Sequence, residues 1–437
     1  MNIKINKIGL YIFLAVIFIT YFFIRLPELK DAFSIGMSKP GDFIQDYMAG
    51  KQLLMGKTLY PSNYREMDEL PQPKNQTHSI LKNKLIDAHP PFAAILLFPL
   101  WFLNYHNAIF LWVIITILCM VLIIALLLKS ESIPLVYIPL VSLFVLAWAP
   151  FQINLSNGQI SILVTLFVIA GWYFLKRERE NLAGIFIALG TMLKFYPGLL
   201  IIYLLINKKY KAFLSATIGI GFILILSYLI TKHDLFYFIF NVLPGDIQRC
   251  EIVFGNTSFN GFFTQLFLHL QPYGNTKAYI PVVNRFDRNL YLYGTEALFL
   301  LYWVYSINKY NYDNDTGFSV FIISSLLLSP LCWNHYLTLL LLPLVVFAKE
   351  LLKKRTISEV VIFLTALFFI SIDTSSVYFF KALYVVRGFI PGHPWSFFYR
   401  MTFYLLPFYG MVLLLILNFR LIKQSQKSTS EHPANQS

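Results

Sequence analysis

Hydrophobic residues occur along this chain in long, almost unbroken runs rather than in an alternating pattern. Without apolar/polar alternation the runs do not resemble barrel strands, and a backbone inside a bilayer must satisfy its own hydrogen bonds, so each run is predicted to be a helix. Each is about long enough to cross a hydrocarbon core of roughly 30 Å. The runs cover residues 8–26, 106–128, 133–149, 159–175, 211–231, 288–307, 356–372 and 401–421. The pattern predicts an all-α membrane protein that spans the bilayer many times.

Two further hydrophobic runs, 182–206 and 317–348, are interrupted near their middle. The sequence Lys194-Phe195-Tyr196-Pro197 breaks the first run, and the segment from Ser329 to His335 breaks the second. Short loops rich in Lys and Arg are normally cytoplasmic, and all the basic clusters obey this rule only if each broken run crosses the membrane outward and back. The clusters are residues 176–179, 208–211, 349–355 and 420–423. This topology gives about twelve spans with both termini in the cytoplasm.

The same topology places a large first loop, residues 27–105, on the outer side of the membrane. Within it, residues 88–104 are apolar but short and proline-rich, which is typical of an interfacial or re-entrant segment. We expect residues 1–423 to form a single integral membrane domain and the polar residues 424–437 to form a disordered cytoplasmic tail. The other outer segments are 150–158, 232–287 and 373–400.

The amino-acid composition also indicates that this chain lies in a lipid bilayer. Of its 437 residues, 57% are hydrophobic and 13% are charged, whereas a soluble surface usually needs about a quarter of charged residues. The net charge of +13 lies in short loops rather than on one face, so it sets topology and does not indicate nucleic-acid binding. The three cysteines follow no disulfide or zinc pattern, and no glycine-rich nucleotide motif occurs. We therefore expect no cofactor, and whether a divalent metal takes part is left open.

Two carboxylates lie near the start of the first outer loop. Asp42 and Asp46 are four residues apart in a segment that predicts a short helix, capped by Gly41 or Asp42 and ended by Gly56. A carboxylate beside the membrane surface can take a proton from a hydroxyl group or hold a cation. In the alternative interpretation, Asp42 only caps the helix and Asp46 is solvated.

Lys194 is the most informative single residue, because it interrupts a hydrophobic run. An ammonium at membrane depth is costly unless it is paired, so it indicates a functional site. Its partner is predicted to be an anion, either a phosphate at the membrane surface or a carboxylate such as Asp42 in a purely structural pair.

Further polar residues occur where hydrophobic runs begin, end or break. His89 precedes two prolines that fix the approach of the chain to the interface, and a structural role suits it as well as a ligand contact does. In Asn157-Gly158-Gln159, Asn157 can cap a helix, the glycine permits close approach, and Gln159 is expected to point into the bundle or a pocket. His335 can contact a phosphate or move a proton, and Trp333 can stack on a sugar.

Taken in order, these motifs resemble family 87 glycosyltransferases over about residues 40–350. The family belongs to the GT-C class of multi-helix membrane enzymes, whose known members include polyprenyl-phosphate-mannose-dependent α-mannosyltransferases. The matching motifs are Asp42-Phe43 with Tyr47-x-Ala49-Gly50, Leu54-x-Gly56-x-x-Leu59-Tyr60, His89-Pro90-Pro91, Asn157-Gly158-Gln159, Ala183-Gly184 with Leu193-Lys194-x-x-Pro197, Asn256-x-Ser258 and Ser329-Pro330-x-x-Trp333-x-His335.

The resemblance implies transfer of a hexose, mannose-like, from a polyprenyl-phosphate donor to a hydroxyl group of a lipid or glycan acceptor. It implies an inverting reaction on the outer face of a plasma membrane, in a bacterium, with Asp42 as general base and Asp46 as the second choice. The implied donor-phosphate residues are Lys194, His335 and Arg249, and the implied substrate-binding residues are Tyr47, His89, Asn157, Gln159, Asn256, Ser258 and Trp333.

Two other classes of protein remain open. A transporter or lipid flippase would also suit about twelve spans and an intramembrane lysine, although the chain shows no internal repeat of the kind that inverted-repeat transporters carry. A non-catalytic membrane scaffold would not require Asp42, Lys194 and His335 to lie on one side of the membrane.

Overall fold

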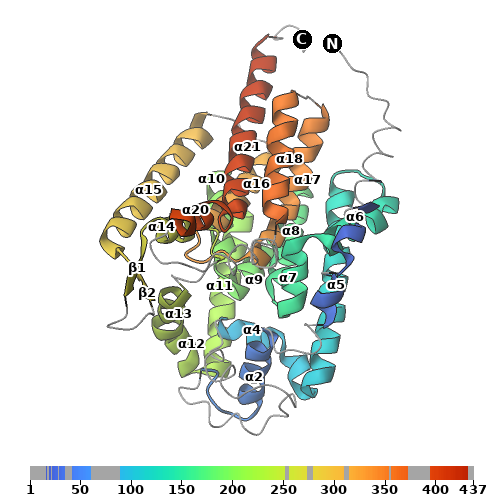
Figure 1. Ribbon diagram of the computed structural model, residues 1–437. Coiled ribbons are helices and arrows are strands. Elements are labelled where there is room, and N and C mark those ends of the chain that lie inside the picture. The colour runs from blue at the N-terminus through green and yellow to red at the C-terminus, as the bar shows by residue number, and fades with distance from the viewer. Residues whose placement is uncertain are drawn as a thin grey trace. The chain divides into compact units, whose positions relative to one another are not determined.

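The computed structural model describes residues 16, 19–20, 22–27, 29–34, 42–60, 89–250, 255–272, 279–309, 314–353, 356–372 and 394–431. Within these residues the chain divides into two compact units, Met1–Asp246 and Ile247–Ser437. Both units are built mainly from helices, and Figure 1 colours these helices by their position along the chain.

The first unit contains a short-helix region and a set of long apolar helices. Residues 22–27 and 29–34 are helical and precede the first labelled helix. The elements are α2 (Phe43–Leu54), α4 (Pro91–Leu96), η2 (Phe98–Phe102), α5 (Tyr105–Ser130), η3 (Leu135–Tyr137), α6 (Ile138–Ala147), α7 (Ala149–Asn157), α8 (Ser161–Lys176), α9 (Glu180–Leu193), η4 (Tyr196–Gly198), α10 (Leu199–Ile206), α11 (Tyr210–Thr231), α12 (His233–Tyr237) and the π-helical η5 (Phe238–Val242). Helix α13 (Leu243–Cys250) contains the boundary between the units.

Helix α9 is the central packing element of the first unit, because it contacts both α8 and α11. Small residues allow this close approach: a Cβ atom added to Gly184 would lie 2.2 Å from the Ala212 carbonyl oxygen of α11. The Ser215 hydroxyl of α11 also donates a 2.7 Å hydrogen bond to the Asn181 carbonyl of α9. Small side chains and interhelical hydrogen bonds of this kind are what hold helices together in lipid.

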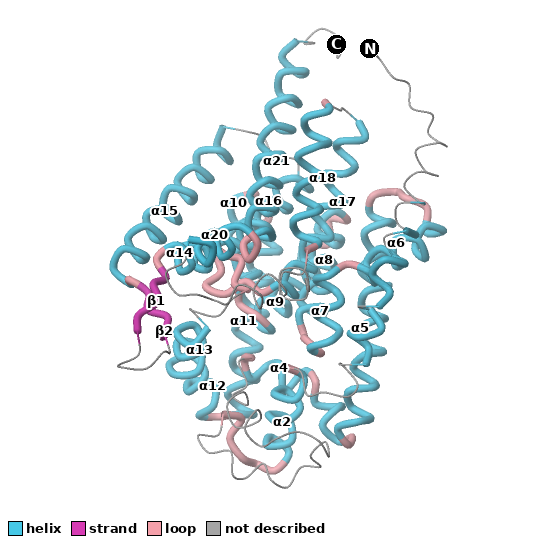
Figure 2. Tube along the Cα trace, viewed as in Figure 1, coloured by secondary structure: helices cyan, strands magenta, loops and turns pink. Residues whose placement is uncertain are grey.

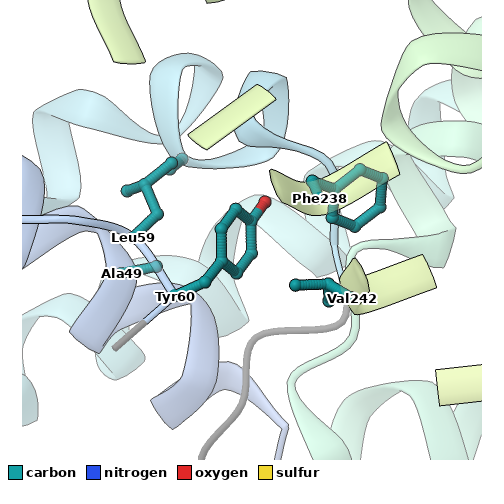
Figure 3. Packing of buried hydrophobic residues seen from close by; sticks show 6 residues of the cluster. Ala49, Leu59, Tyr60, Phe238 and Val242 are labelled. Carbon is teal, nitrogen blue, oxygen red and sulfur yellow. The ribbon is translucent and has the colours of Figure 1, made fainter. Parts of the chain in front are cut away.

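The short helices α2 and α4 pack against each other, and each contributes a residue to a buried cluster that also contains the two ends of η5. In Figure 3 the ring of Tyr60 lies among Ala49, Leu59, Phe238 and Val242. The Tyr60 and Phe238 rings are 5.6 Å apart, centroid to centroid. The Asp234 carboxylate fixes the same region by accepting hydrogen bonds from the Thr58 hydroxyl at 2.6 Å and the Leu59 amide at 2.8 Å. These contacts attach the chain after α2 to α12 and η5.

The second unit adds one small sheet to a set of helices. A two-stranded antiparallel hairpin pairs Leu268 with Val283 and Pro272 with Tyr279, and it stands out in Figure 2 as the magenta strands. Helix α18 packs closely on α21, and α16 contacts both α17 and α21. The elements are α14 (Phe259–Leu266), β1 (Leu268–Pro272), β2 (Tyr279–Val283), α15 (Arg285–Lys309), α16 (Asn314–Leu327), η6 (Asn334–Leu340), α17 (Leu341–Lys353), α18 (Ile357–Ser371), α20 (Pro394–Thr402) and α21 (Leu406–Glu431).

The helices confirm the membrane character of the chain but not the count of about twelve spans. Among the described residues, four helices are long and apolar enough to cross a bilayer, and a fifth span results if α6 and α7, which meet at 71°, count as one. Several other apolar helices have 10–17 residues. At 1.5 Å per residue these are shorter than a core of roughly 30 Å, so length alone does not make them spans. The four are Tyr105–Ser130, Tyr210–Thr231, Asn334–Leu352 and Arg400–Leu421.

Both predicted breaks in hydrophobic runs are present. Helix α9 ends at Leu193, and Lys194 has extended backbone before η4 begins. The second run is interrupted between α16 and η6. Two features differ from the expectation: the hairpin β1–β2 lies in the predicted outer segment 232–287, and α21 continues as a helix to Glu431, beyond residue 424. No glycine or proline occurs between residues 411 and 432, so nothing in the sequence stops that helix earlier.

Large parts of two predicted outer segments, residues 61–88 of the first loop and residues 373–393, lie outside the described part of the chain, as does most of the predicted first span, 8–26.

Candidate functional site

Asp42 lies at the first turn of α2 and does not act as a helix cap. Its backbone is already helical, with φ −70° and ψ −22°, and its side chain makes no capping hydrogen bond to the helix. The side chain is half-buried, and one carboxylate oxygen, Oδ2, accepts a hydrogen bond from the Gln159 side-chain amide. The capping-only interpretation of Asp42 is therefore wrong, because its carboxylate bonds to Gln159 in the turn between α7 and α8.

A continuous polar network joins Asp42 to Lys194 through Gln159. The Lys194 ammonium donates hydrogen bonds to Gln159 Oε1 at 2.8 Å and to the Ser161 hydroxyl oxygen at 3.0 Å. Lys194 and Gln159 are only 6% and 5% exposed, and Ser161 is fully buried. Two neutral groups therefore accept hydrogen bonds from Lys194, and Gln159 lies between Lys194 and Asp42 and bonds to both.

The turn between α7 and α8 holds Gln159 in this position. Gly158 ends α7 in the left-handed conformation, with φ +63° and ψ +35°, and its carbonyl accepts a 2.9 Å hydrogen bond from the Trp112 indole. A Cβ atom on Gly158 would lie 2.6 Å from Cβ of Phe43 in α2. The Phe43 ring in turn stacks on Trp112 at 5.9 Å. Gly158 therefore brings α2, and Asp42 with it, against the turn that carries Gln159.

We predict that Gly158→Ala lowers the thermal unfolding midpoint, because the new methyl group would strain the left-handed turn and displace Phe43. The expected cost is about 1–3 kcal/mol. The matched control is Gly221→Ala, since a Cβ atom there meets nothing within 4 Å in the middle of α11. Unfolding of both purified variants in one detergent measures the difference. Equal midpoints for the two variants would refute the packing explanation.

Asp46 forms a buried pair with His89. Its Oδ1 lies 2.7 Å from His89 Nδ1, and Asp46 is fully buried while His89 is 6% exposed. Asp46 Oδ2 has no hydrogen-bond partner among the described residues. The His89 carbonyl accepts a 2.7 Å hydrogen bond from the Tyr60 hydroxyl, which ties the pair to the cluster of Figure 3. The expectation of a solvated Asp46 is wrong, because α4 and the chain before it cover this side of α2.

We predict that Asp46→Asn destabilises the protein, because the amide cannot reproduce a carboxylate bonded to His89 inside the protein. The expected loss is about 1–3 kcal/mol, as for other buried polar groups that lose a partner. The thermal midpoint of the purified variant measures this loss. An Asp46→Asn protein as stable as wild type would show that the pair does not hold α2 in place.

Tyr47 and Asn157 are both predicted substrate contacts, and the structure shows how each is held within the protein. The Tyr47 hydroxyl donates a 2.9 Å hydrogen bond to the Leu103 carbonyl, and its ring meets Tyr105 edge-on at 5.3 Å. Burial raises the pKa of the Tyr47 phenol, so the group stays a neutral donor. Asn157 is the last residue of α7 and is half-buried, so it does not cap α8 as the sequence had suggested.

In the second unit, Asn256 and Ser258 are engaged in local structure. Asn256 Oδ1 accepts hydrogen bonds from the Ser258 hydroxyl at 2.8 Å and the Cys332 amide at 2.9 Å, and its Nδ2 donates to the Pro330 carbonyl at 2.9 Å. The Ser258 hydroxyl also caps α14 through the Gly261 amide. The Asn256 side chain therefore binds the backbone of residues 330 and 332 and holds the two motifs together.

Trp333 and His335 lie directly after the segment 330–332 that Asn256 binds. Trp333 precedes η6 and is half-buried, and His335 is 6% exposed with its ring edge-on to Tyr336 at 4.8 Å. Arg249 belongs to α13, but its side chain lies outside the described part of the structure.

Sequence reasoning missed two residues of the first unit. Ser161 accepts a hydrogen bond from Lys194, and Asp234 anchors the chain after α2. Ser161 could have been found as a small hydroxyl residue two positions after Gln159 at the start of an apolar run. Asp234 carries a weaker signal, as an acidic residue just after the run 211–231. In the part of the chain that the structure describes, no three His, Cys, Asp or Glu side chains are grouped as metal ligands.

Apolar helices of spanning length and a buried carboxylate–amide–ammonium network define a multi-span membrane protein with an internal polar site. The chain belongs to glycosyltransferase family 87, whose family model matches residues 88–332, more than half of its length, and it is therefore a membrane glycosyltransferase. No curated protein matches the chain. The match includes His89, Gln159 and Lys194 but begins after α2, so it does not cover Asp42 or Asp46.

Proposed function

We propose that this glycosyltransferase moves a hexose, mannose-like, from a polyprenyl-phosphate donor to a hydroxyl group of a lipid or glycan acceptor, with inversion and with Asp42 as general base. The observation that carries the proposal is the network that links a half-buried carboxylate to a buried ammonium through one amide. A base and a cation held in one network suit a reaction that removes a proton at one atom while an anionic phosphate leaves at another.

Asp42 suits the role of base better than Asp46 because it is partly exposed. Asp46 is fully buried and bonded to His89, whereas Asp42 is partly exposed. Gln159 occupies Asp42 Oδ2, and no hydrogen bond from a described residue reaches Oδ1. A general base must come within hydrogen-bond distance of the proton that it takes, and of these two carboxylates only Asp42 belongs to a partly exposed residue. Asp46 then holds α2 in place through its bond to His89.

Lys194 suits the donor phosphate. A polyprenyl phosphate presents an anion at the interface and a hydrocarbon tail in the bilayer, and Lys194 provides positive charge between apolar helices. The Gln159 amide oxygen and the Ser161 hydroxyl oxygen each accept a hydrogen bond from this ammonium and orient it. A phosphate leaving group gains negative charge as its bond to the sugar breaks, and a nearby ammonium stabilises that charge.

The proposed reaction is a single displacement at the anomeric carbon. The acceptor oxygen forms the new bond to this carbon as its proton passes to Asp42, and the bond from the carbon to the phosphate oxygen breaks. The phosphate leaves on its polyprenyl chain with both bonding electrons. The activated phosphate ester supplies the driving force, so the proposal needs no nucleotide and no cofactor.

In the second unit the proposal assigns phosphate contacts to His335 and Arg249 and sugar stacking to Trp333. Trp333 is partly exposed, which leaves ring surface for a ligand. In this proposal Asn256 and Ser258 shape the loop before Trp333 rather than contact substrate. Their side chains already bond to each other, and Asn256 also bonds to the Cys332 amide. We place the protein in a bacterial plasma membrane among its lipids, with the site on the outer face and both termini in the cytoplasm.

A donor comparison tests this function. Purified protein in liposomes would be given radiolabelled sugar either on polyprenyl phosphate or on a nucleotide, together with a panel of lipid and glycan acceptors. We expect label to reach an acceptor only from the lipid phosphate. Transfer from the nucleotide sugar would contradict the proposed donor, and uptake of solute into the vesicles without transfer would favour a transporter.

A further inference from the structure

Gln159 has both ends of its side-chain amide engaged inside the protein. Nε2 donates to Asp42, and Oε1 accepts from Lys194 at 2.8 Å. The side chain is only 5% exposed, and its backbone amide donates a 3.0 Å hydrogen bond to the Asn154 carbonyl. An amide offers its donor at one end and its acceptor at the other, so a carboxylate and an ammonium on opposite sides fix its orientation. Each polar end of Gln159 is therefore already bonded to another side chain, and at 5% exposure little of the residue is open to a sugar.

Gln152 is another buried glutamine of the first unit, and it shows that burial alone does not give a glutamine this role. Gln152, in α7, is 4% exposed, and its amide oxygen accepts a 2.8 Å hydrogen bond from Arg25. Its amide nitrogen donates to the Arg25 carbonyl at 3.3 Å. Gln152 thus ties the chain near Arg25 to α7, while Gln159 connects the two charged groups of the proposed site.

We infer that Gln159 is a positioning residue that couples the base Asp42 to Lys194, and not a substrate-binding residue. This inference rests on the proposed function, since it gives Asp42 and Lys194 the roles of base and phosphate contact. A donor phosphate that draws the Lys194 ammonium toward itself also moves the Gln159 amide, and the Asp42 carboxylate follows. The base is then aligned for the acceptor when the donor is in place.

A kinetic comparison tests the coupling. Gln159→Met keeps the length of the side chain and removes both hydrogen bonds. We expect kcat to fall about 10-fold or more while the donor KM stays within about three-fold, since the loss falls on the reacting step. Gln152→Met, the same chemical change at another buried glutamine of the first unit, should keep the wild-type kcat. A Gln159→Met variant whose only defect is a raised donor KM would overturn the inference and make Gln159 a donor contact.

A double variant separates an effect through Asp42 from a direct effect on substrate. If Gln159 acts through the base, Asp42→Asn with Gln159→Met should be no slower than Asp42→Asn alone, because residues that act as one unit are not additive. A further loss of the size seen in the single Gln159→Met variant would show that Gln159 acts independently of Asp42, and the inference would fail.

Thermal unfolding gives a reading that requires no turnover. The midpoint shifts of Asp42→Ala and Lys194→Met should be non-additive when Gln159 is present and additive in the Gln159→Met background. Additive shifts in both backgrounds would overturn the coupling. If the wild-type protein transfers sugar from no lipid phosphate but the shifts remain non-additive, the coupling stands and the proposed donor is wrong.

Discussion

Replacing Asp42 by Asn should reduce kcat for sugar transfer by about 10²–10⁴-fold, the range that general-base catalysis typically contributes. Asparagine keeps the shape of the side chain and can still accept a hydrogen bond from Gln159, but it cannot take a proton from the acceptor hydroxyl. The donor affinity should remain within about three-fold of wild type, because Asp42 carries no role in holding the phosphate. Turnover with saturating donor and binding of labelled donor measure the two quantities.

Asp46→Asn is the matched comparison for this experiment, because it makes the same chemical change one turn further along α2. It should lower stability but retain most of the transfer rate per folded molecule, since Asp46 is fully buried against His89. The opposite outcome, an active Asp42→Asn protein and an inactive but folded Asp46→Asn protein, would assign the base to Asp46.

The second large effect is expected at Lys194. Lys194→Met removes the ammonium but keeps an unbranched side chain of similar length. Donor affinity should fall about 10- to 100-fold, because hydrogen bonds to charged groups contribute roughly 1.5–3 kcal/mol. Acceptor KM should change much less, since the proposal places the cation at the donor phosphate. Binding of labelled polyprenyl-phosphate sugar to the purified variant measures the loss.

Lys211→Met provides the control, because Lys211 is exposed in the first turn of α11 and belongs to the same unit. It should bind donor like wild type. Lys194→Met also leaves Gln159 Oε1 without its ammonium partner, so binding is compared per folded molecule at a temperature below both unfolding midpoints. Unchanged donor affinity in folded Lys194→Met would remove Lys194 from the phosphate site.

The helices were largely predictable because a long hydrophobic run inside a bilayer satisfies its backbone hydrogen bonds by forming a helix. The run 106–128 corresponds to α5, and the break at Lys194 separates α9 from η4 as expected. The bend between α6 and α7 was not predicted, because the run 133–149 continues past Ala147 without a polar residue. The hairpin β1–β2 was also missed, since its ten paired residues lie between apolar runs and show no strong strand pattern.

The candidate site was predictable in its residue types but not in its connections. Asp42, Gln159 and Lys194 were each indicated by a polar side chain at the end or the break of an apolar run. Their linkage depends on Gly158, whose missing Cβ lets Phe43 approach the turn before α8, and local sequence does not report such a contact across 115 positions. The burial of Asp46 has the same origin, because its partner His89 is 43 residues away.

The central claim is a single displacement in which a carboxylate acts as base and not as nucleophile. The anomeric configuration of the first product tests this claim most directly. Purified protein would be supplied with a polyprenyl-phosphate sugar of defined anomeric configuration, and the glycosylated acceptor would be examined by nuclear magnetic resonance. We predict a product of the opposite configuration, formed by wild type and strongly reduced in Asp42→Asn. A product that retains the donor configuration would contradict it.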